Sequence, residues 1–356
     1  CWCPHQQPRK SPLVVGTPGQ RQKWRWGQFD KLTAAHQASG KKRSAVGWSL
    51  LRQPTQFHLF YLPIYCKLMV NNFYISVMQL RYLLVLTFLM LSGIVNSQSA
   101  VIAYGKNTKA GKYADIRGFQ MYYETYGTGE PLLIIHGNGG SIGDFNFQIP
   151  YFEKKYKVIL ADSRAQGKSL DNGDSLTYEM MADDLDALLD VLKLDSCYVI
   201  GWSDGGINGL LLAMRHPEKV KKLAVTGANL WPDSSAIDPY FLFSMERAYD
   251  STALLAKTPK NIRGLKLLHL LVHQPHITTA QLRKIKCPTL VIGGDHDIIL
   301  PQHTMVIAEN IPKSYLWILP NAGHATPIFN SEAFNKTVYE FFKNPYRNID
   351  GPARSQ

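Results

Sequence analysis

The stretch CYVIGW-SDGG-INGLLLAMRH, residues 197–216, decides the fold. An apolar strand pattern runs to Gly201-Trp202, and a helical pattern begins just after Ser203-Asp204. A serine in such a G-x-S-x-G turn between a strand and a helix has strained backbone geometry, and its hydroxyl is exposed at the end of the strand. Because a chance G-x-S-x-G is common, the assignment depends on the flanking strand and helix. We predict that Ser203 is a nucleophile.

A serine nucleophile needs a base and an acid that orients the base. The apolar run TLVIGG (289–294) leads into Asp295-His296-Asp297, so two aspartates leave the end of this strand, and the spacing G-x-x-D-x-x-x-P favours Asp297 over Asp295. The run YLWIL (315–319) is followed by a loop that ends in Gly323-His324. We expect His324 to be the base, which gives the chain order serine, acid, histidine.

The nucleophile also needs donors for a developing oxyanion. The apolar run PLLIIHGNGG (131–140) ends in a turn that can direct the backbone N–H of Asn138 at the oxyanion. The N–H of Asp204, which directly follows the nucleophile at a helix N-terminus, is the expected second donor. We expect His136 to be a structural residue of this turn and not the base.

Strand and helix patterns alternate through the body of the chain, which is typical of a mostly parallel sheet with helices on both faces. Residues 229–286 interrupt this alternation with three helical signals, and we expect them to form a helical cap whose aromatic residues line an apolar pocket. The expected strands are 114–118, 119–125, 131–136, 157–162, 197–202, 222–227, 288–294 and 315–319, and the expected helices are 177–193, 204–215, 302–310 and 329–343.

These motifs together resemble the α/β-hydrolase fold superfamily, over about residues 115–345. The resemblance includes the segment Asp162–Ser169, where Ala165 replaces a glycine that many relatives carry. It implies a mostly parallel eight-stranded sheet with a small helical cap, and a Ser203–Asp297–His324 catalytic triad. A serine at position 203, where the dehalogenases and epoxide hydrolases of this fold carry aspartate, excludes those two chemistries.

A narrower resemblance is to the valacyclovir hydrolase (biphenyl hydrolase-like) group, through Gly201–Gly206 and Gly227-Ala228-Asn229. It implies that Asp204 binds the ammonium of an α-amino-acid ester. The alternative is that Asp204 is an acid complementing the dipole in the first turn of a helix. The basic residues of the cap outnumber its acids, which disfavours a strongly acidic pocket. The further candidate substrate-binding residues are Trp202, Asn229 and Trp231.

Several other signals fail on inspection. The segment 167–169 (GKS) lacks the glycine of a phosphate-binding loop, because Asp162 stands in its place. His269 and His273 are spaced for metal binding on one helix face, but no Glu or Cys accompanies them. We therefore expect no metal and no organic cofactor. Cys197 and Cys287 precede apolar runs, and we expect both to be buried and unpaired.

The charge of the chain is unevenly distributed. The formal net charge of the 356 residues is +12, but residues 1–77 have 11 basic residues and one acid, whereas residues 98–356 have a balance of +1.

The stretch 78–97 has Arg81, a ten-residue apolar segment and then small residues, which is typical of a signal peptide that starts at Met78. We expect 1–77 to be a non-native or disordered basic leader, with no nucleic-acid partner. The apolar segment is shorter than a spanning helix, so we expect cleavage before Gln98 and no stable membrane anchor.

The sequence thus predicts an exported serine hydrolase, periplasmic or secreted, in which residues 98–356 form the α/β-hydrolase domain. Its expected substrate is a small carboxylic ester, with an α-amino-acid ester or activated amide as variants. Two alternatives stay open. One is carbon–carbon bond hydrolysis or peracid formation on the same triad, since function depends on the pocket more than on the fold. The other is a ligand-binding protein without catalysis. The oligomeric state is not predicted.

Overall fold

The computed structural model describes residues 102–171, 173 and 175–349. The predicted leader and signal peptide lie outside the described residues. No helix within the described ranges is long and apolar enough to cross a membrane.

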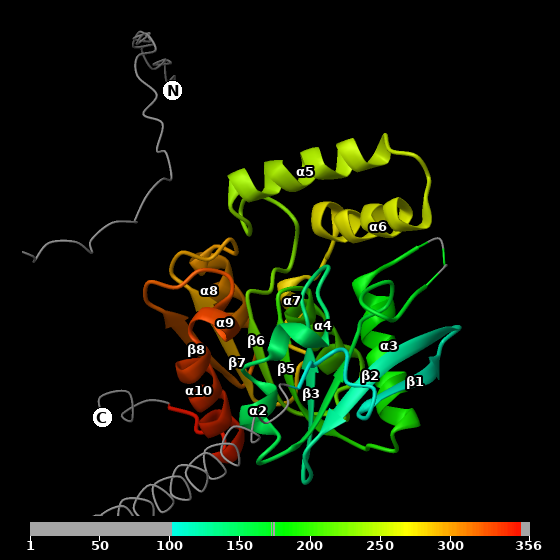
Figure 1. Cartoon of the computed structure of the whole chain (residues 1–356). Coiled ribbons are helices and arrows are strands. Elements are labelled where there is room, and N and C mark those ends of the chain that lie inside the picture. The colour runs from blue at the N-terminus through cyan, green and yellow to red at the C-terminus, as the bar shows by residue number, and fades with distance from the viewer. Residues whose placement is uncertain (1–101, 172, 174, 350–356) are drawn as a thin grey trace, which may run out of the picture. The chain divides into compact units, whose positions relative to one another are not determined.

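The described chain is built on one eight-stranded sheet with the order β1-β2-β4-β3-β5-β6-β7-β8 (Figure 1). Strand β2 is antiparallel to β1 and to β4, and every other neighbouring pair is parallel. The strands are β1 (Gly111–Ile116), β2 (Phe119–Tyr126), β3 (Pro131–Ile135), β4 (Lys157–Ala161), β5 (Cys197–Trp202), β6 (Val220–Thr226), β7 (Thr289–Gly294) and β8 (Ser314–Leu319).

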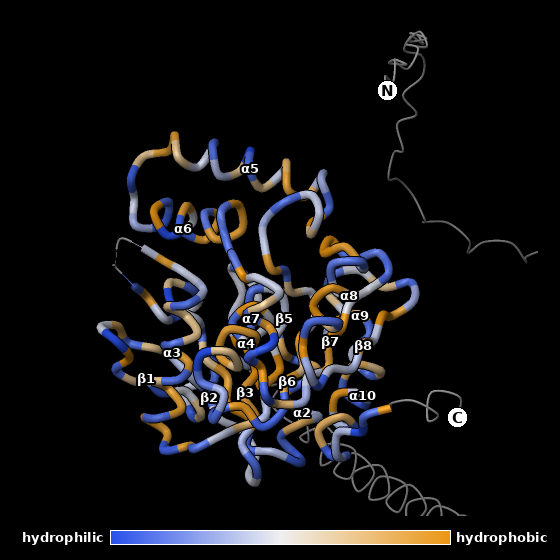
Figure 2. The backbone as a smooth tube through the Cα atoms, turned by 180° about the vertical axis from the view of Figure 1, so that it is seen from behind, coloured by the Kyte–Doolittle hydropathy of each residue, from blue (hydrophilic) through white to orange (hydrophobic). Residues whose placement is uncertain are grey.

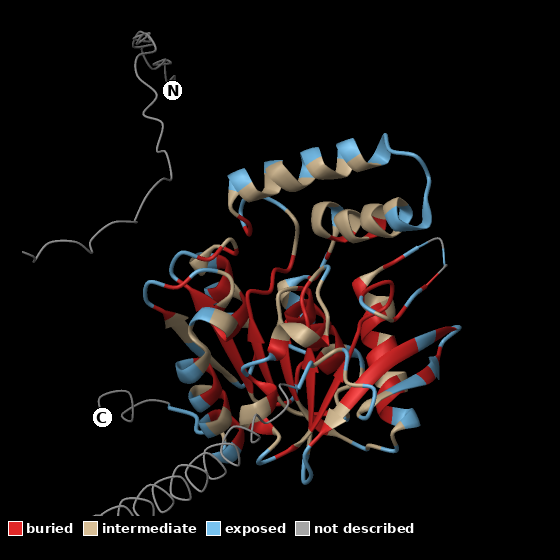
Figure 3. Cartoon of the chain, viewed as in Figure 1, coloured by how far each residue is buried: buried red, intermediate tan, exposed pale blue. Residues whose placement is uncertain are grey.

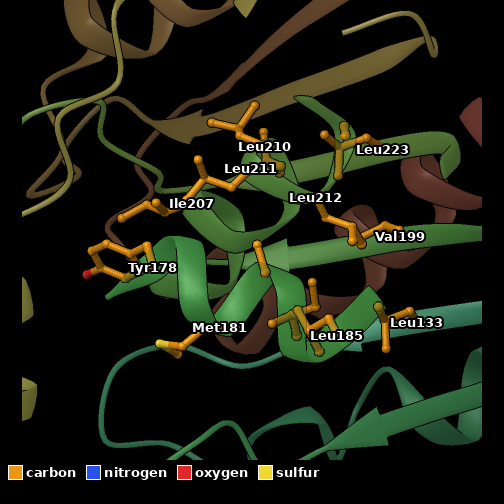
Figure 4. Packing of buried hydrophobic residues seen from close by; sticks show 14 of the residues in the cluster. Leu133, Tyr178, Met181, Leu185, Val199, Ile207, Leu210, Leu211, Leu212 and Leu223 are labelled. Atoms are coloured by element: carbon orange, nitrogen blue, oxygen red, sulfur yellow. The ribbon is translucent and has the colours of Figure 1, made fainter. Parts of the chain in front are cut away.

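Helices cover both faces of the sheet because most of its strands are apolar on both sides. One face packs against α3 (Tyr178–Val191), α4 (Asp204–Arg215) and α8 (Pro301–Asn310). Figure 4 shows this core, in which Leu133, Val199 and Leu223 point from three strands towards α3 and α4. The opposite face packs against η1 (Ile142–Phe145), α2 (Ile149–Phe152) and α10 (Ser331–Lys343). The inner strands β3 to β7 are therefore mostly buried and apolar, whereas the edge strands β1 and β8 contain few buried residues (Figures 2 and 3).

The inserted segment 229–286 divides into two parts. Helices α5 (Pro239–Ala253) and α6 (Pro259–His273) pack on each other above the end of the sheet (Figure 1). No residue of α5 is buried, as the pale blue and tan ribbon of Figure 3 shows. The short helix α7 (Thr279–Leu282) instead packs against α4 and α8, with Leu282 in the core of the sheet. We use the word cap below for α5, α6 and the loop between them.

These observations confirm the predicted fold class. Strand β1 ends at Ile116 and not at 118, because Arg117 and Gly118 form the hairpin turn, both with positive φ (43° and 91°). The predicted C-terminal helix is α10, which begins at Ser331 and not at 329, and the short helix α9 (Thr326–Phe329) precedes it. Cys197 and Cys287 are both buried and free, as predicted.

Candidate active site

Ser203 lies in the sharp turn between β5 and α4. Its backbone has φ 58° and ψ −122°, a conformation that L-residues rarely adopt, and its N–H donates to the Thr226 carbonyl at 2.9 Å. A Cβ at Gly201 would overlap the Gly205 carbonyl, and one at Gly205 would overlap the Ile135 carbonyl. The two glycines thus allow the first turn of α4 to pack closely against β5 and β3, and the strain presents Ser203 at the end of the sheet.

Three side chains predicted to act together form one hydrogen-bonded chain. Ser203 Oγ lies 2.9 Å from His324 Nε2, and His324 Nδ1 lies 2.7 Å from Asp297 Oδ1. The side chain of Asp297 is fully buried, whereas that of His324 is one-fifth exposed. Asp297 Oδ1 also accepts the N–H of Ile299 at 3.0 Å, which fixes the carboxylate on its own loop. The arrangement can hold His324 with Nδ1 protonated and Nε2 free to take a proton from Ser203.

Asp295, the alternative acid, lies in a different environment. Its Oδ1 accepts the N–H of Ala322 at 3.0 Å and so joins the loop after β7 to the loop that carries His324. Backbone donors lower the pKa of its exposed carboxyl. The two aspartates therefore differ in their contacts: Asp297 binds the imidazole ring, and Asp295 binds the backbone of the loop that carries His324.

Trp202 also acts on the histidine loop. Its indole Nε1–H donates to the His324 carbonyl at 2.9 Å, and the two rings are 6.1 Å apart. The residue predicted to bind substrate therefore also positions the imidazole ring, because it binds the backbone of the base. Gly227, the residue that follows β6, has φ 63°, and a Cβ at this position would overlap the His324 ring.

The backbone N–H groups of Asn138 and Asp204 have no hydrogen-bond acceptor among the described residues. Both residues border the cavity that contains Ser203, and Asp204 is the first residue of α4. The first N–H groups of a helix lack intrahelical partners and attract negative charge. The pair can therefore serve as an oxyanion hole.

The side chain of Asn138 connects the loop after β3, residues 136–140, which we call the oxyanion loop, to two other elements. Its Nδ2 donates to Asp204 Oδ2 at 2.8 Å and to the Leu267 carbonyl of α6 at 3.1 Å. The next residue, Gly139, donates its N–H to Gln166 Oε1 at 2.6 Å. The oxyanion loop is thus held by α4, by the cap and by the loop after β4.

Asp204 is 2% exposed, and burial raises its pKa to about 6. Hydrogen bonds from Asn138 and Tyr178 favour its carboxylate and lower that pKa in part. Sequence reasoning missed Tyr178, the first residue of α3, because no local pattern distinguishes it from a core tyrosine. The Asp204 carboxylate, at the N-terminus of α4, is therefore hydrogen-bonded by two side chains of the protein itself.

His136 is a structural residue, as predicted. Its Nε2 accepts the N–H of Ser163 at 2.9 Å, and its Nδ1 donates to the Gly137 carbonyl at 2.7 Å. Complete burial lowers its pKa, so the ring is neutral and joins the oxyanion loop to the segment after β4.

A cavity of about 240 Å³ contains the nucleophile, and apolar side chains of the cap form much of its wall. Of the predicted substrate-binding residues, Trp202, Asp204 and Asn229 line it, whereas Trp231 is not among the lining residues. Trp231 packs edge-on against His303 at 4.7 Å. Tyr240 and Phe243 of the cap are also outside its wall and are 80% and 53% exposed. The apolar lining residues are Ile237, Phe241, Leu242, Met245, Leu271, Ile298 and Ile299.

One group of described residues has side chains close enough to share a metal ion: Asp186, His216 and Glu218. His216 already contacts Asp183 and Asp186 at 3.0 and 3.3 Å. It follows the C-terminal end of α4, whereas Ser203 precedes the N-terminal end, so this group is remote from the nucleophile. His269 and His273, the spaced pair on α6, lie against each other and Tyr249.

Comparisons with known proteins agree with this fold. A family model for the alpha/beta hydrolase fold matches residues 130–279. The serine hydrolase BPHL of Homo sapiens is 26% identical over 262 residues, which cover 68% of this chain and 89% of BPHL. A 2-hydroxy-6-oxononadienedioate/2-hydroxy-6-oxononatrienedioate hydrolase of Comamonas testosteroni is 24% identical, covering 64% and 93%. Among solved structures, a thermophilic esterase from Thermogutta terrifontis shares the fold, with TM-score 0.56, 22% identity and coverage of 66% and 100%.

Proposed function

The chain belongs to the α/β-hydrolase superfamily and is a hydrolase, and from this premise we propose that it cleaves carboxylic esters through Ser203, His324 and Asp297. The observation that carries the proposal is the hydrogen-bonded chain of 2.9 and 2.7 Å from Ser203 Oγ through His324 to Asp297 Oδ1. Such a chain, on a strained turn that opens into a cavity, is the arrangement that activates a serine hydroxyl.

In the proposed reaction, Ser203 Oγ attacks the ester carbonyl while His324 Nε2 accepts the serine proton. Asp297 holds the imidazole in the correct tautomer and stabilises the imidazolium that forms. The N–H groups of Asn138 and Asp204 stabilise the tetrahedral oxyanion. His324 then gives its proton to the leaving alcohol, and water activated by the same imidazole hydrolyses the acyl-enzyme.

The lining of the cavity favours an apolar acyl or alcohol group. Phe241 and Met245 of α5 line the same cavity as Ser203. We infer that Asp204 positions the oxyanion hole more than it binds a substrate ammonium, because its carboxylate already accepts hydrogen bonds from Asn138 and Tyr178. The proposed substrate is therefore a plain carboxylic ester, with aminoacyl esters as the variant to be tested.

Steady-state hydrolysis of p-nitrophenyl acyl esters tests this proposal. We expect turnover by the wild-type chain and its loss in Ser203→Ala. Ser244→Ala, a half-buried serine of α5 that does not line the catalytic cavity, is the matched control and should retain activity. Absence of turnover in wild type, or equal turnover in Ser203→Ala, would contradict the proposal. The first of these outcomes would favour a ligand-binding role without catalysis.

We also propose that the protein is exported through a signal peptide at 78–97. The support is the short basic start, the apolar segment and the small residues before Gln98. N-terminal sequencing of the protein from its natural source tests this: a start at Gln98 is expected, and a start at residue 1 would contradict it.

Carbon–carbon bond hydrolysis is a second candidate, because the Comamonas testosteroni relative is named for a dienedioate substrate. The same triad can attack a ketone carbonyl. Parallel assays with a p-nitrophenyl ester and a dienedioate ring-fission product discriminate the two. We expect the ester to be turned over faster, and the reverse preference would favour the second candidate.

A further inference from the structure

A second cavity, of about 520 Å³, lies under the cap beside the cavity of Ser203. We call it the distal cavity. Its wall includes Leu176 of the body together with Ala253, Ile262 and Leu265 of the cap, so much of it is apolar. The reaction proposed above needs none of these residues.

The two cavities share a wall. Gln274, which directly follows α6, lines both of them. One face of α5 also runs along both, because Leu242 and Met245 line the catalytic cavity while Tyr249 and Ala253 line the distal one. Residues three and four apart lie on one face of a helix. The two cavities therefore adjoin beneath α5, with Gln274 between them.

Only weak hydrogen bonds hold the Gln274 side chain between the two cavities. Its Oε1 accepts the N–H of Tyr178 at 3.4 Å, and its Nε2 donates to the Leu176 carbonyl at 3.4 Å. Both distances are beyond the usual range for N–H···O bonds. The side chain can thus rotate at small cost and let a ligand extend from one cavity into the other.

Two lysines, Lys257 and Lys266, line the distal cavity, and no Asp or Glu does so among the described residues. His269 also lines it, but burial lowers the pKa of its ring, which favours the neutral form. Lys266 is already engaged: its ammonium donates to the Gly173 carbonyl and lies 3.8 Å from Asp171 Oδ2. Lys257 is exposed, and no carboxylate of the described residues forms an ion pair with it. Among the described residues of this wall, Lys257 is therefore the lysine available to a ligand.

We propose that the distal cavity binds the remote end of the substrate, and that this end is a long apolar chain terminating in a carboxylate. The inference rests on the proposed ester hydrolysis at Ser203. The apolar walls desolvate the chain, and Lys257 pairs with its terminal anion. The chain belongs either to the acyl group or to the alcohol of the ester, and the test separates these two sources.

The test uses the full-length chain and two substrate series. The first contains p-nitrophenyl half-esters of dicarboxylic acids, from succinate to hexadecanedioate, each paired with its methyl-capped neutral analogue. The second contains acetyl esters of ω-hydroxy fatty acids, paired with their methyl esters. In one series, we expect KM for the long carboxylate to be about three- to fivefold below that for its neutral partner. A preference in the first series assigns the chain to the acyl group, and one in the second assigns it to the alcohol.

Two substitutions and their controls locate the effect. Lys257→Gln should abolish the preference for the carboxylate, whereas Lys260→Gln, an exposed lysine outside the wall, should retain it. Ala253→Trp fills the distal cavity and should lower the kcat/KM ratio of long to short esters about tenfold or more. Ser251→Trp, exposed on α5 outside this wall, should not change that ratio.

The outcomes separate this inference from the proposed function. If p-nitrophenyl acetate is hydrolysed but neither series shows dependence on length and charge, the distal subsite is refuted and the ester hydrolase stands. A preference that persists in both Lys257→Gln and Ala253→Trp also refutes it. If wild type hydrolyses no ester at all, the proposed function itself fails.

Discussion

The side-chain amide of Asn138 lies 2.8 Å from Asp204 Oδ2, so a hydrogen bond joins the two residues whose backbone N–H groups face the proposed oxyanion. The same amide donates to the Leu267 carbonyl of the cap. The oxyanion loop, the first turn of α4 and the cap therefore share one polar side chain. This relationship makes Asn138 and Asp204 positioning residues as well as sources of backbone donors.

Asn138→Ala should lower kcat about tenfold with little change in KM. The backbone N–H of residue 138 survives the substitution, but its loop loses two hydrogen bonds, and removing one partner of a buried polar group costs about 1–3 kcal/mol. Steady-state kinetics with a p-nitrophenyl ester measures the effect. Asn146→Ala, an exposed asparagine on the same segment, is the control. An unchanged kcat in Asn138→Ala would show that its side chain does not position the oxyanion hole.

Asp204 should make stability depend on pH in an unusual direction for an aspartate. Burial raises its pKa from 3.8 to about 6. Folding therefore favours the protonated carboxyl, and this stabilisation is fully present below the unfolded pKa and is lost as the pH rises through about 6. Relative to Asp204→Asn, wild type should lose about 1.5 kcal/mol of unfolding free energy between about pH 5 and about pH 8. Urea unfolding measures this difference, and parallel pH profiles for the two proteins would contradict it.

Aminoacyl and plain acyl esters of matched size should respond equally to Asp204→Asn. The carboxylate already accepts hydrogen bonds from Asn138 and Tyr178, so its replacement removes a positioning group common to both substrates. The ratio of kcat/KM between aminoacyl and acyl p-nitrophenyl esters measures the response. A loss of about tenfold or more for the aminoacyl ester alone would instead identify Asp204 as the ammonium site.

The two aspartates after β7 should differ sharply in their effect on rate. Asp297→Asn should lower kcat by about four orders of magnitude, because the amide can stabilise the wrong imidazole tautomer. Asp295→Asn keeps an oxygen that can accept the Ala322 N–H, so its kcat should stay within about tenfold of wild type. Single-substrate kinetics on both variants gives the comparison. Similar losses in the two variants would contradict the separate roles assigned to them.

The sequence predicts the sheet and the Ser203–His324–Asp297 geometry because these depend on local patterns: an apolar strand, a glycine turn, and a polar residue at the strand end. The surroundings of the site depend on packing between distant segments. The contact of Tyr178 with Asp204 arises only when α3 packs beside α4. The cap shows the same limit. Aromatic residues occur on more than one side of α5, so the sequence does not distinguish Phe241 at the cavity from exposed Tyr240.

The most direct test of the account is labelling with a fluorophosphonate probe followed by peptide mass spectrometry. The probe reacts only with an activated serine, and the account predicts a single adduct on Ser203 in wild type and none in Ser203→Ala. Ser244→Ala should still be labelled at Ser203. An unlabelled wild type, or an adduct that persists in Ser203→Ala, would contradict the claim that Ser203 is the nucleophile.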